Sequence, residues 1–216
     1  MKKILLIGAS GFVGSAILNE AINREYKVTA VVRHPEKIIL SSENLTVIKA
    51  DVSSAETVAE LSKGFDTVVS AYNPGWTNPN IAEETASVYN SILVGVKKAG
   101  VKRLLCVGGA GSLFCAPGVR LMETGAIPEA FMPAVKALAD FYLLTLTGEK
   151  ETDWVFFSPA GSIAVGERTG QFRLGKDDLI VSKDGNSNIS VEDYAVAMMD
   201  EVENKNYHRE RFTIGY

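Results

Sequence analysis

Short apolar runs, many of them β-branched, alternate along this chain with longer segments of helical periodicity. Several runs are apolar without alternation, as in a parallel sheet that is covered on both faces. Strands are predicted at Lys3–Ile7, Lys27–Val32, Leu45–Lys49, Thr67–Ala71, Arg103–Val107, Trp154–Phe157 and Arg211–Ile214. Helices are predicted at about Phe12–Asn23, Ser54–Lys63, Ala82–Ala99 and Pro133–Glu149, with capping boxes at Ser53/Glu56 and Ser190/Asp193. The pattern predicts one doubly wound α/β domain spanning residues 1–216.

Two long stretches, Gly108–Ala130 and Pro159–Asn188, interrupt this rhythm. Loops of that length inside a compact domain are usually functional, and both follow the carboxyl end of a predicted strand, where such sheets bind ligands. We therefore expect the substrate region to be formed by residues 72–80, 108–130 and 159–188.

Composition narrows the class of protein. The chain has 216 residues, 46% of them hydrophobic and 22% charged, as is typical of globular proteins. A net charge of -4 gives no electrostatic footprint for nucleic acid or a membrane surface. Cys106 and Cys115 lack ligand spacing, so no metal site is predicted. The apolar runs, Ile4–Ile7 among them, are too short for a membrane span or a signal segment, which predicts a cytoplasmic protein. The oligomeric state is not fixed by the sequence.

Three glycines directly follow the first predicted strand, in Gly8-Ala-Ser-Gly11-Phe-Val-Gly14. The spacing is one residue longer than the usual dinucleotide fingerprint, but the physical requirements are the same. Gly8 permits a tight turn, Gly11 lets a diphosphate approach the backbone, and Gly14 lets the helix pack closely on the strand. Free N–H groups at the positive helix end would hold the diphosphate. The position favours dinucleotide binding over a generic strand-to-helix turn.

These glycines carry a family resemblance. GASGFVG, Asp51-Val52 and the turn Gly108-Gly-Ala-Gly-Ser112 resemble the atypical and extended short-chain dehydrogenases/reductases. The closing ISVEDYAVAMMDE and RFTIGY resemble, more narrowly, the NAD(P)H-binding group that includes NADH-flavin reductases and biliverdin reductase B-type proteins. The resemblance covers essentially the whole chain. It implies a Rossmann-type doubly wound parallel sheet with helices on both faces and strand order 3-2-1-4-5-6-7.

The resemblance also implies which residues contact the cofactor. They are Ser10, Phe12 and Val13 beside the three glycines, Asp51 and Val52 at the adenine, Ala71, Tyr72 and Asn73 beside the ribose and diphosphate, and Gly109 and Pro159. For Asp51, a role as a cap of the following helix stays open. At the end of the second strand, where an acidic residue would select NAD, the chain has Arg33 followed by His34 and Lys37. This predicts a preference for NADPH, with NAD as the alternative cofactor and a solvated surface arginine as the alternative interpretation.

The catalytic residues of the resembling enzymes match only in part. Typical short-chain dehydrogenases use Tyr-x-x-x-Lys, and here the lysine matches as Lys136 while Met132 stands at the tyrosine position. Tyr142, six residues after Lys136, would point away from that helix face. Lys136 as ribose-binding residue and Ser112 as a hydroxyl near the nicotinamide are therefore the predicted catalytic residues, with a solvated lysine and a turn serine as their alternatives.

A flat substrate could lie between aromatic and apolar side chains of the loops. Tyr72 and Trp76 are expected on one side and Leu113 and Phe114 on the other, with local packing as the alternative. Arg168 and Arg173 either face substrate or a partner chain, or belong to a solvated surface. Because hydride addition to a carbonyl needs a positioned acid, the missing tyrosine favours a flavin-like acceptor.

The leading hypothesis is thus an NAD(P)H-dependent oxidoreductase that passes hydride to a flat conjugated acceptor, with flavin as substrate rather than prosthetic group. Two alternatives stay open. One is a non-catalytic dinucleotide-sensing domain similar to NmrA-like regulators. The other is an enzyme similar to nucleotide-sugar epimerases and dehydratases.

Overall fold

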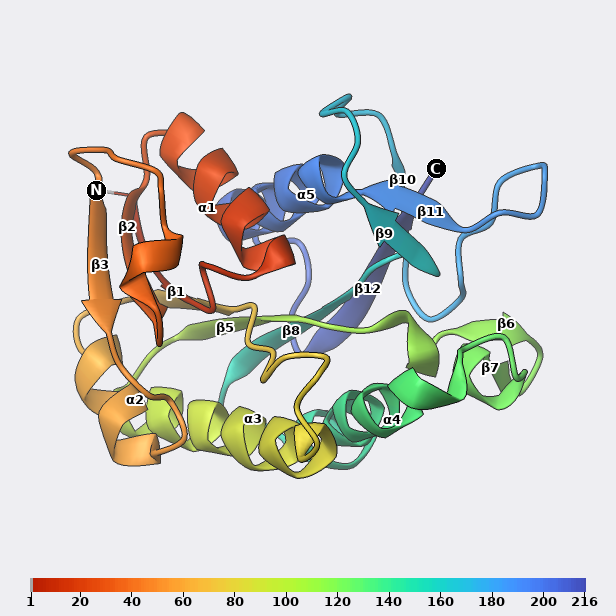
Figure 1. The fold of residues 1–216 in the computed structure, drawn as a ribbon, viewed down its shortest axis with the longest axis horizontal. Coiled ribbons are helices and arrows are strands. Elements are labelled where there is room, and N and C mark those ends of the chain that lie inside the picture. Colours follow the sequence, from red (N-terminus) through yellow and green to blue (C-terminus); the bar gives the residue numbers. More distant parts are fainter. Residues whose placement is uncertain (1) are drawn as a thin grey trace.

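An eight-stranded sheet forms the centre of the computed structural model, which describes residues 2–216 (Figure 1). From edge to edge its strands are β3 (Leu45–Lys49), β2 (Lys27–Val32), β1 (Lys3–Ile7), β4 (Thr67–Ser70), β5 (Arg103–Val107), β8 (Asp153–Ser158), β12 (Glu210–Gly215) and β10 (Arg173–Gly175). The seven strands predicted from the sequence pair in parallel, and in chain order they give 3-2-1-4-5-6-7. The predicted Rossmann-type sheet is confirmed. The antiparallel edge strand β10 was not predicted.

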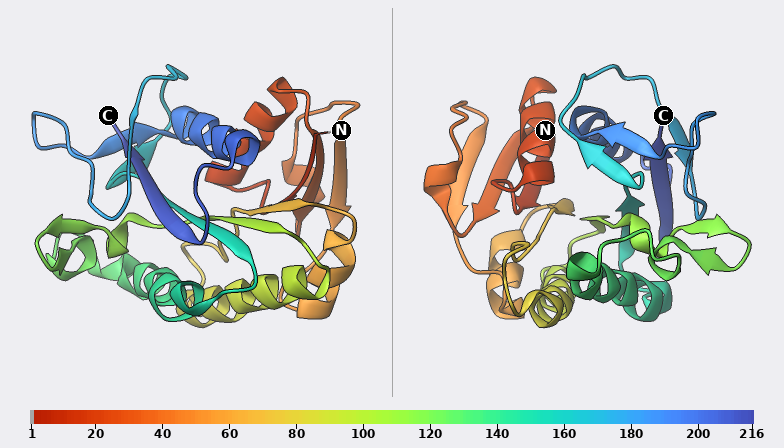
Figure 2. Two further views of the ribbon diagram at one scale, coloured as in Figure 1. Left: turned by 180° about the vertical axis from the view of Figure 1, so that it is seen from behind. Right: turned by 45° about the vertical axis from the view of Figure 1, so that its right-hand side comes forward.

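Helices cover both faces of this sheet (Figures 1 and 2). On one face lie α1 (Phe12–Asn23) and α5 (Val191–Asn204), and on the other lie α2 (Ala55–Ser62), α3 (Ile81–Lys98) and α4 (Met132–Asp140). In β1, Ile4 and Leu6 pack into the core on the α1–α5 side, while Leu5 and Ile7 pack into the core on the other side. Burial on both faces is why this strand is apolar without alternation.

Shorter elements occupy the long connections. Two small sheets pair β6 (Phe114–Ala116) with β7 (Val119–Arg120) and β9 (Ser162–Ala164) with β11 (Asn188–Ser190). Short 3₁₀ helices are η1 (Pro35–Lys37), η2 (Ala110–Ser112), η3 (Leu121–Glu123), η4 (Glu129–Phe131) and η6 (Leu146–Gly148), and η5 (Phe141–Thr145) is a π-helical turn. The predicted helix over 133–149 therefore ends as an α-helix at Asp140 and continues as η5 and η6.

By length and composition alone, the stretch Glu129–Gly148 could cross a membrane. The lengths of the uninterrupted apolar runs in the sequence did not indicate such a stretch. In the structure this stretch is built from η4, α4, η5 and η6, and part of it enters the core. Tyr142 stacks on Phe156 with ring centroids 4.8 Å apart, and Leu146 is fully buried. Its apolar residues are thus used partly in packing against β8.

The structure corrects one of the two predicted helix caps. Helix α2 is capped by Ser54, not Ser53, since the Ser54 hydroxyl accepts a hydrogen bond from the Thr57 N–H at 3.4 Å. Helix α5 begins as predicted, with the Ser190 hydroxyl accepting from the Asp193 N–H at 3.0 Å.

Candidate functional site

The turn from β1 into α1 has the close backbone approaches that its glycines suggested. Gly8 has a φ of +80°, and a Cβ there would lie 2.5 Å from the carbonyl oxygen of Ala71. A Cβ on Gly14 would lie 2.1 Å from the carbonyl oxygen of Gly8. Neither position has room for a side chain, so the turn between two adjacent strand ends requires glycine at both.

The beginning of α1 is available to an anion. Its N-cap residue, Gly11, supplies no side-chain cap, and the first turn carries no acidic residue. The leading N–H groups of an α-helix have no intrahelical acceptor, and their partial positive charge favours phosphate oxygens. Gly11 is itself exposed, as is the adjacent Phe12. The residues present therefore fit a dinucleotide diphosphate, which would be held by the backbone of Gly11, Phe12 and Val13, with Ser10 half-buried beside them.

A second group of predicted residues lies where β2, β3 and β4 end. Arg33 is exposed, and its Nη2 donates to the carbonyl oxygen of Pro74 at 3.3 Å. Burial raises the pKa of the Tyr72 phenol, and the nearby Arg33 charge opposes that shift. Asp51, also close enough to influence Tyr72, accepts a hydrogen bond from the Ser53 N–H at 2.9 Å, while Val52 is buried. This contact closes a local turn before α2, whose cap is Ser54, so the alternative role of Asp51 as the cap of that helix is not confirmed.

The turn after β4 is held in place from both sides. The Tyr89 hydroxyl, fully buried on α3, contacts the carbonyl oxygens of Tyr72 at 3.0 Å and Val107 at 3.2 Å. Beyond it, Asn73 Oδ1 accepts from the Gly75 N–H at 2.7 Å. Tyr89 was not singled out from the sequence, because nothing in a helical pattern distinguishes it from other core residues. The segment from Ala71 to Asn73 is consequently a fixed wall beside the glycine turn.

Ser112, predicted to act near the nicotinamide, is instead buried in a side-chain network. Its hydroxyl accepts from Nη1 of Arg211 at 2.9 Å, and the same guanidinium donates to Asp177 Oδ1 through Nε at 3.0 Å and Nη2 at 2.6 Å. The guanidinium also lies 4.5 Å from the ring centre of Tyr142. These contacts support a structural role for Ser112 and do not support contact with substrate. They also place Tyr142 in the core, away from the site.

The two long loops expected to form the substrate region contact each other. Phe114 donates from its N–H to the carbonyl of Asp177 at 2.9 Å and accepts from the Leu179 N–H at 2.8 Å. Leu113 is fully buried, so the prediction that it walls the substrate is wrong. The chain changes direction at η2. The Leu113 side chain therefore points into the protein, while Phe114 is half-buried. Gly109 and Pro159, at the ends of β5 and β8, are also half-buried.

The two loop arginines have partners within the chain. Arg168 makes a two-bond ion pair with Glu20 of α1, with both distances 2.8 Å. Arg173 donates to the carbonyl oxygens of Val181, at 2.7 Å, and Tyr216. Both side chains connect segments of this chain to one another, so nothing in their geometry calls for a substrate or a partner subunit.

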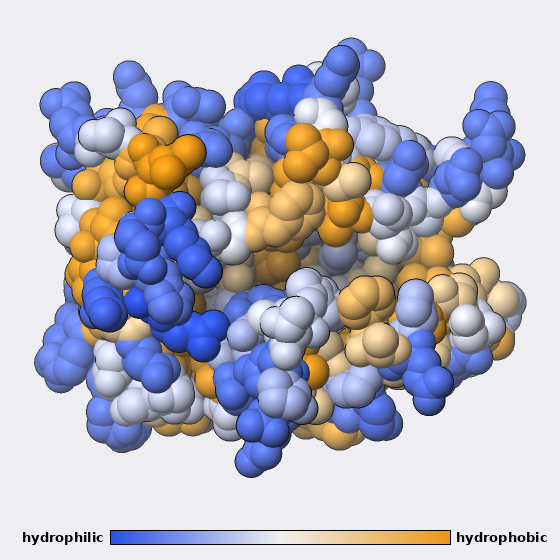
Figure 3. All heavy atoms as spheres, viewed as in Figure 1, coloured by the Kyte–Doolittle hydropathy of each residue, from blue (hydrophilic) through white to orange (hydrophobic). Residues whose placement is uncertain are grey.

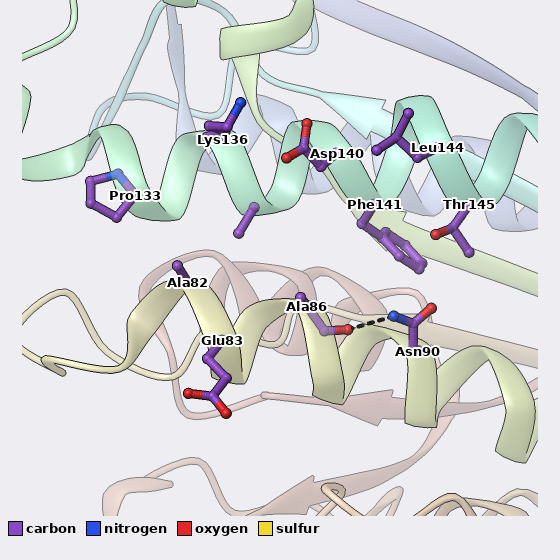
Figure 4. Close-up of a pocket in the computed structure, with 11 residues that line it drawn as sticks. Ala82, Glu83, Ala86, Asn90, Pro133, Lys136, Asp140, Phe141, Leu144 and Thr145 are labelled. Atoms are coloured by element: carbon purple, nitrogen blue, oxygen red, sulfur yellow. Dashed lines mark hydrogen bonds between the residues drawn. The ribbon is translucent and has the colours of Figure 1, made fainter.

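Lys136 is one of the residues that line a solvent-facing groove of about 480 Å³ between α3 and α4, and Figure 4 shows its side chain on the same side of α4 as Asp140, directed away from α3. None of the residues lining the groove belongs to the glycine turn or to the turn after β4. The reason is rotational. Val135 packs against Gly111 of η2, and the next residue is turned by about 100° along an α-helix. The predicted contact between Lys136 and the nicotinamide ribose therefore finds no support.

An aromatic pair that the sequence only half indicated bridges two of the loops. Trp76, in the loop after β4, meets Phe131 of η4 edge to face, with ring centroids 5.3 Å apart and an interplanar angle of 80°. Trp76 was predicted to wall a flat substrate, and no role was predicted for Phe131. Figure 3 shows the corresponding face of the molecule hollowed between α1 and β9 above and the α3–α4 helices below.

Among residues 2–216 no group of His, Cys, Asp or Glu side chains is arranged to hold a metal ion. The site is thus built from backbone N–H groups, a surface arginine and aromatic rings.

Comparison with known proteins agrees with this geometry. A family model described as NAD(P)H-binding matches residues 8–205. The uncharacterized protein YwnB of Bacillus subtilis is 40% identical over 98% of this chain and 97% of its own. A proposed epimerase from Bacteroides thetaiotaomicron has a crystal structure with a TM-score of 0.95, 64% identity, and coverage of 100% of this chain and 97% of that one. A proposed NADH-flavin reductase from Streptococcus pneumoniae has a TM-score of 0.84, 34% identity, and coverage of 100% and 99%.

Proposed function

Because the chain belongs to the NAD(P)H-binding family, we propose that it is an NADPH-dependent oxidoreductase whose hydride acceptor is a flat conjugated molecule such as a flavin. The observation that carries this proposal is the pairing of a glycine turn that fits a diphosphate with an α4 that has Met132 where a catalytic tyrosine would be. The cofactor supplies the hydride, and the chain supplies binding and orientation.

The absence of a tyrosine hydroxyl at position 132 limits which hydride acceptors the site can reduce. Hydride addition to a carbonyl leaves an alkoxide that needs a proton from a positioned acid. Hydride addition to a flavin spreads the charge over the ring system, and water can complete the protonation. Ser112 is buried against Arg211, and Lys136 is an exposed residue beside a groove that no residue of the glycine turn lines, so neither side chain is placed to supply that acid. A conjugated acceptor is the one that such a site can reduce.

Two features support the choice of cofactor and of acceptor. Arg33 stands at the end of β2, where its guanidinium would pair with the 2′-phosphate of NADPH. The Streptococcus pneumoniae protein, 34% identical and similar in fold over the whole chain, is described as a proposed NADH-flavin reductase. We treat the flavin as a substrate that enters and leaves.

The test is oxidation of NADPH under anaerobic conditions with riboflavin or FMN as acceptor, read from loss of nicotinamide absorbance and corrected for the reaction of free flavin. Saturable turnover is expected. A Gly11→Ala variant, in which only the diphosphate turn is changed, is the matched control and should lose activity at low NADPH. Tight NADPH binding with no flavin-dependent turnover would refute the enzyme and favour the sensing domain.

The second candidate is the epimerase-like activity, favoured by the 64% identity to the proposed epimerase from Bacteroides thetaiotaomicron. Such chemistry begins with removal of a proton from a sugar hydroxyl, which again calls for a base near the nicotinamide. Conversion of a panel of nucleotide sugars to their epimers or dehydration products, with NADP⁺ or NAD⁺ bound and followed by NMR, distinguishes the two. We expect no conversion, and catalysed conversion would replace the flavin proposal.

A further inference from the structure

The exposed aromatic residues of this protein are concentrated at one edge. Among residues 2–216 the exposed Phe, Trp and Tyr residues are Phe12, Trp76 and Phe131, at 50%, 59% and 43%. Phe12 opens α1, Trp76 follows β4, and Phe131 directly precedes α4. Since α1 and the loop after β4 leave the carboxyl ends of parallel strands, and α4 runs back toward the start of β8, all three lie at the carboxyl edge of the sheet. A shared location is more informative than single exposed apolar residues, which are common.

The loop that carries Trp76 is held in a defined shape. Asn73 Oδ1 accepts from the Gly75 N–H at 2.7 Å, and the Gly75 carbonyl accepts from the Asn78 N–H at 3.0 Å. Gly75 has a φ of +109°, which a residue with a side chain rarely adopts. Trp76 thus follows one hydrogen-bonded turn and lies inside the next, and its indole is fixed further by the contact with Phe131. An aromatic surface that is already ordered loses little freedom when a ligand binds it.

We infer that Trp76 and Phe131 form a stacking platform for the hydride acceptor, and that the acceptor class is a fused planar ring system. This inference rests on the proposed function. In an edge-to-face pair one ring presents only its edge to the other, so its faces remain free for an offset stack with a third ring. The pair spans the gap between the loop after β4 and the start of α4, beside the fixed wall of Ala71 to Asn73. A small aliphatic carbonyl would gain little from such a surface.

The test measures binding of riboflavin, which has no phosphate to compete for the diphosphate turn, to protein saturated with NADP⁺. Quenching of riboflavin fluorescence gives the dissociation constant. We expect Trp76→Ala and Phe131→Ala each to weaken riboflavin by about two- to twelvefold, the range of one aromatic pair. Trp76→Phe keeps a ring and should restore most of the affinity. Leu144→Ala removes an even more exposed apolar side chain, 77% exposed beside the α3–α4 groove, and should leave the affinity unchanged.

The outcomes separate this inference from the proposed function. Saturable riboflavin binding that the Trp76→Ala/Phe131→Ala double variant changes by less than about twofold overturns the platform, whatever the turnover. No saturable binding of riboflavin to the parent protein overturns it as well. Weakened binding in the alanine variants, with no NADPH oxidation in the parent, keeps the platform and refutes the enzyme. NADPH affinity and urea midpoints, expected to match the parent in all variants, show that the variants are folded.

Discussion

Adding one methyl group at Gly11 or at Gly14 separates binding of the diphosphate from packing of the helix. At Gly14 the new Cβ would lie 2.1 Å from the Gly8 oxygen and 3.1 Å from Cα of Ala9, and the first distance is more than 1 Å inside ordinary contact. Both neighbours are backbone, so α1 must move away from β1. Overpacking of this kind costs about 1–3 kcal/mol, and Gly14→Ala should lose that much free energy of unfolding.

Gly11→Ala should behave in the opposite way. The nearest atom to its new Cβ is the Gly8 oxygen at 3.4 Å, and its φ of -78° suits any residue. The free energy of unfolding should therefore fall by no more than about 1 kcal/mol, the cost of an N-cap change. The methyl group would, however, occupy the space where the diphosphate approaches the N–H groups. Losing one charge-assisted hydrogen bond costs about 1.5–3 kcal/mol, or about ten- to hundredfold in NADPH affinity.

The assay combines urea unfolding of the ligand-free protein with calorimetric titration of NADPH. The expected pattern is a stable Gly11→Ala protein that binds NADPH poorly and a Gly14→Ala protein that is destabilised. Parent-like NADPH affinity in Gly11→Ala would show that the diphosphate does not lie on this turn. Parent-like stability in Gly14→Ala would show that the close approach of α1 to β1 is relieved at no cost.

Three further predictions concern charged residues. Arg33→Ala should weaken NADPH binding by about ten- to hundredfold and leave NADH binding unchanged in the same calorimetric titration. An equal loss of affinity for both cofactors would exclude a contact between Arg33 and the 2′-phosphate. So would a parent protein that binds NADH as tightly as NADPH. Lys136→Ala should keep NADPH affinity and flavin turnover within about twofold of the parent, since the lysine lies beside the outer groove. A larger loss of either would show that Lys136 contacts the cofactor or the acceptor. Glu20→Gln should lower the free energy of unfolding at about pH 7 by about 1–3 kcal/mol. Hydrogen bonding by Arg168, against the opposing effect of burial, holds the pKa of Glu20 below its usual value. The stability difference between the parent and Glu20→Gln should therefore vanish as pH falls through the pKa of Glu20 in the folded protein. Urea titrations at several pH values measure this difference, and a difference that does not change with pH would contradict the prediction.

The sequence predicted the fold because the signals for it are local. In β1 each of Ile4 to Ile7 is buried, so the run is apolar throughout and marks a strand inside a parallel sheet. Strand β10 could not be predicted, because its three residues pair with β12 only after the connection between β8 and α5 has folded back on the sheet. The pairing of Gly175 with Thr213 is an example. Short strands defined by tertiary contacts leave no period in the sequence.

The same distinction holds for the site. Gly14 could be assigned from spacing alone, because the atom that leaves no room for its side chain, the Gly8 oxygen, lies within the same turn of the chain. The turn spacing also indicated Gly8, whose φ is +80°, but its close approach to Ala71 is seen only in the folded structure. The direction of Lys136 depends instead on how α4 sits on η2, and a match to Tyr-x-x-x-Lys carries no information on that rotation. The pairing of Trp76 with Phe131 likewise joins residues 55 positions apart, and only the assembled loops bring them within 5.3 Å.

The loop after β4 touches both ends of the proposed site, which leads to a last prediction. Pro74, whose carbonyl accepts from Arg33, is two residues before Trp76. The turns around Trp76 are ordered by their own hydrogen bonds, and a 2′-phosphate that immobilises the Arg33 guanidinium would in addition fix the position of this ordered loop relative to the end of β2. Coupling between two ligands is reciprocal, so whatever NADP⁺ adds to riboflavin affinity, riboflavin adds to NADP⁺ affinity. Riboflavin should therefore bind more tightly to protein saturated with NADP⁺ than with NAD⁺, by about twofold or more, and Arg33→Ala should abolish the difference. Equal riboflavin affinities in the parent would mean that the loop is rigid without the phosphate, and that cofactor choice and acceptor binding are set independently.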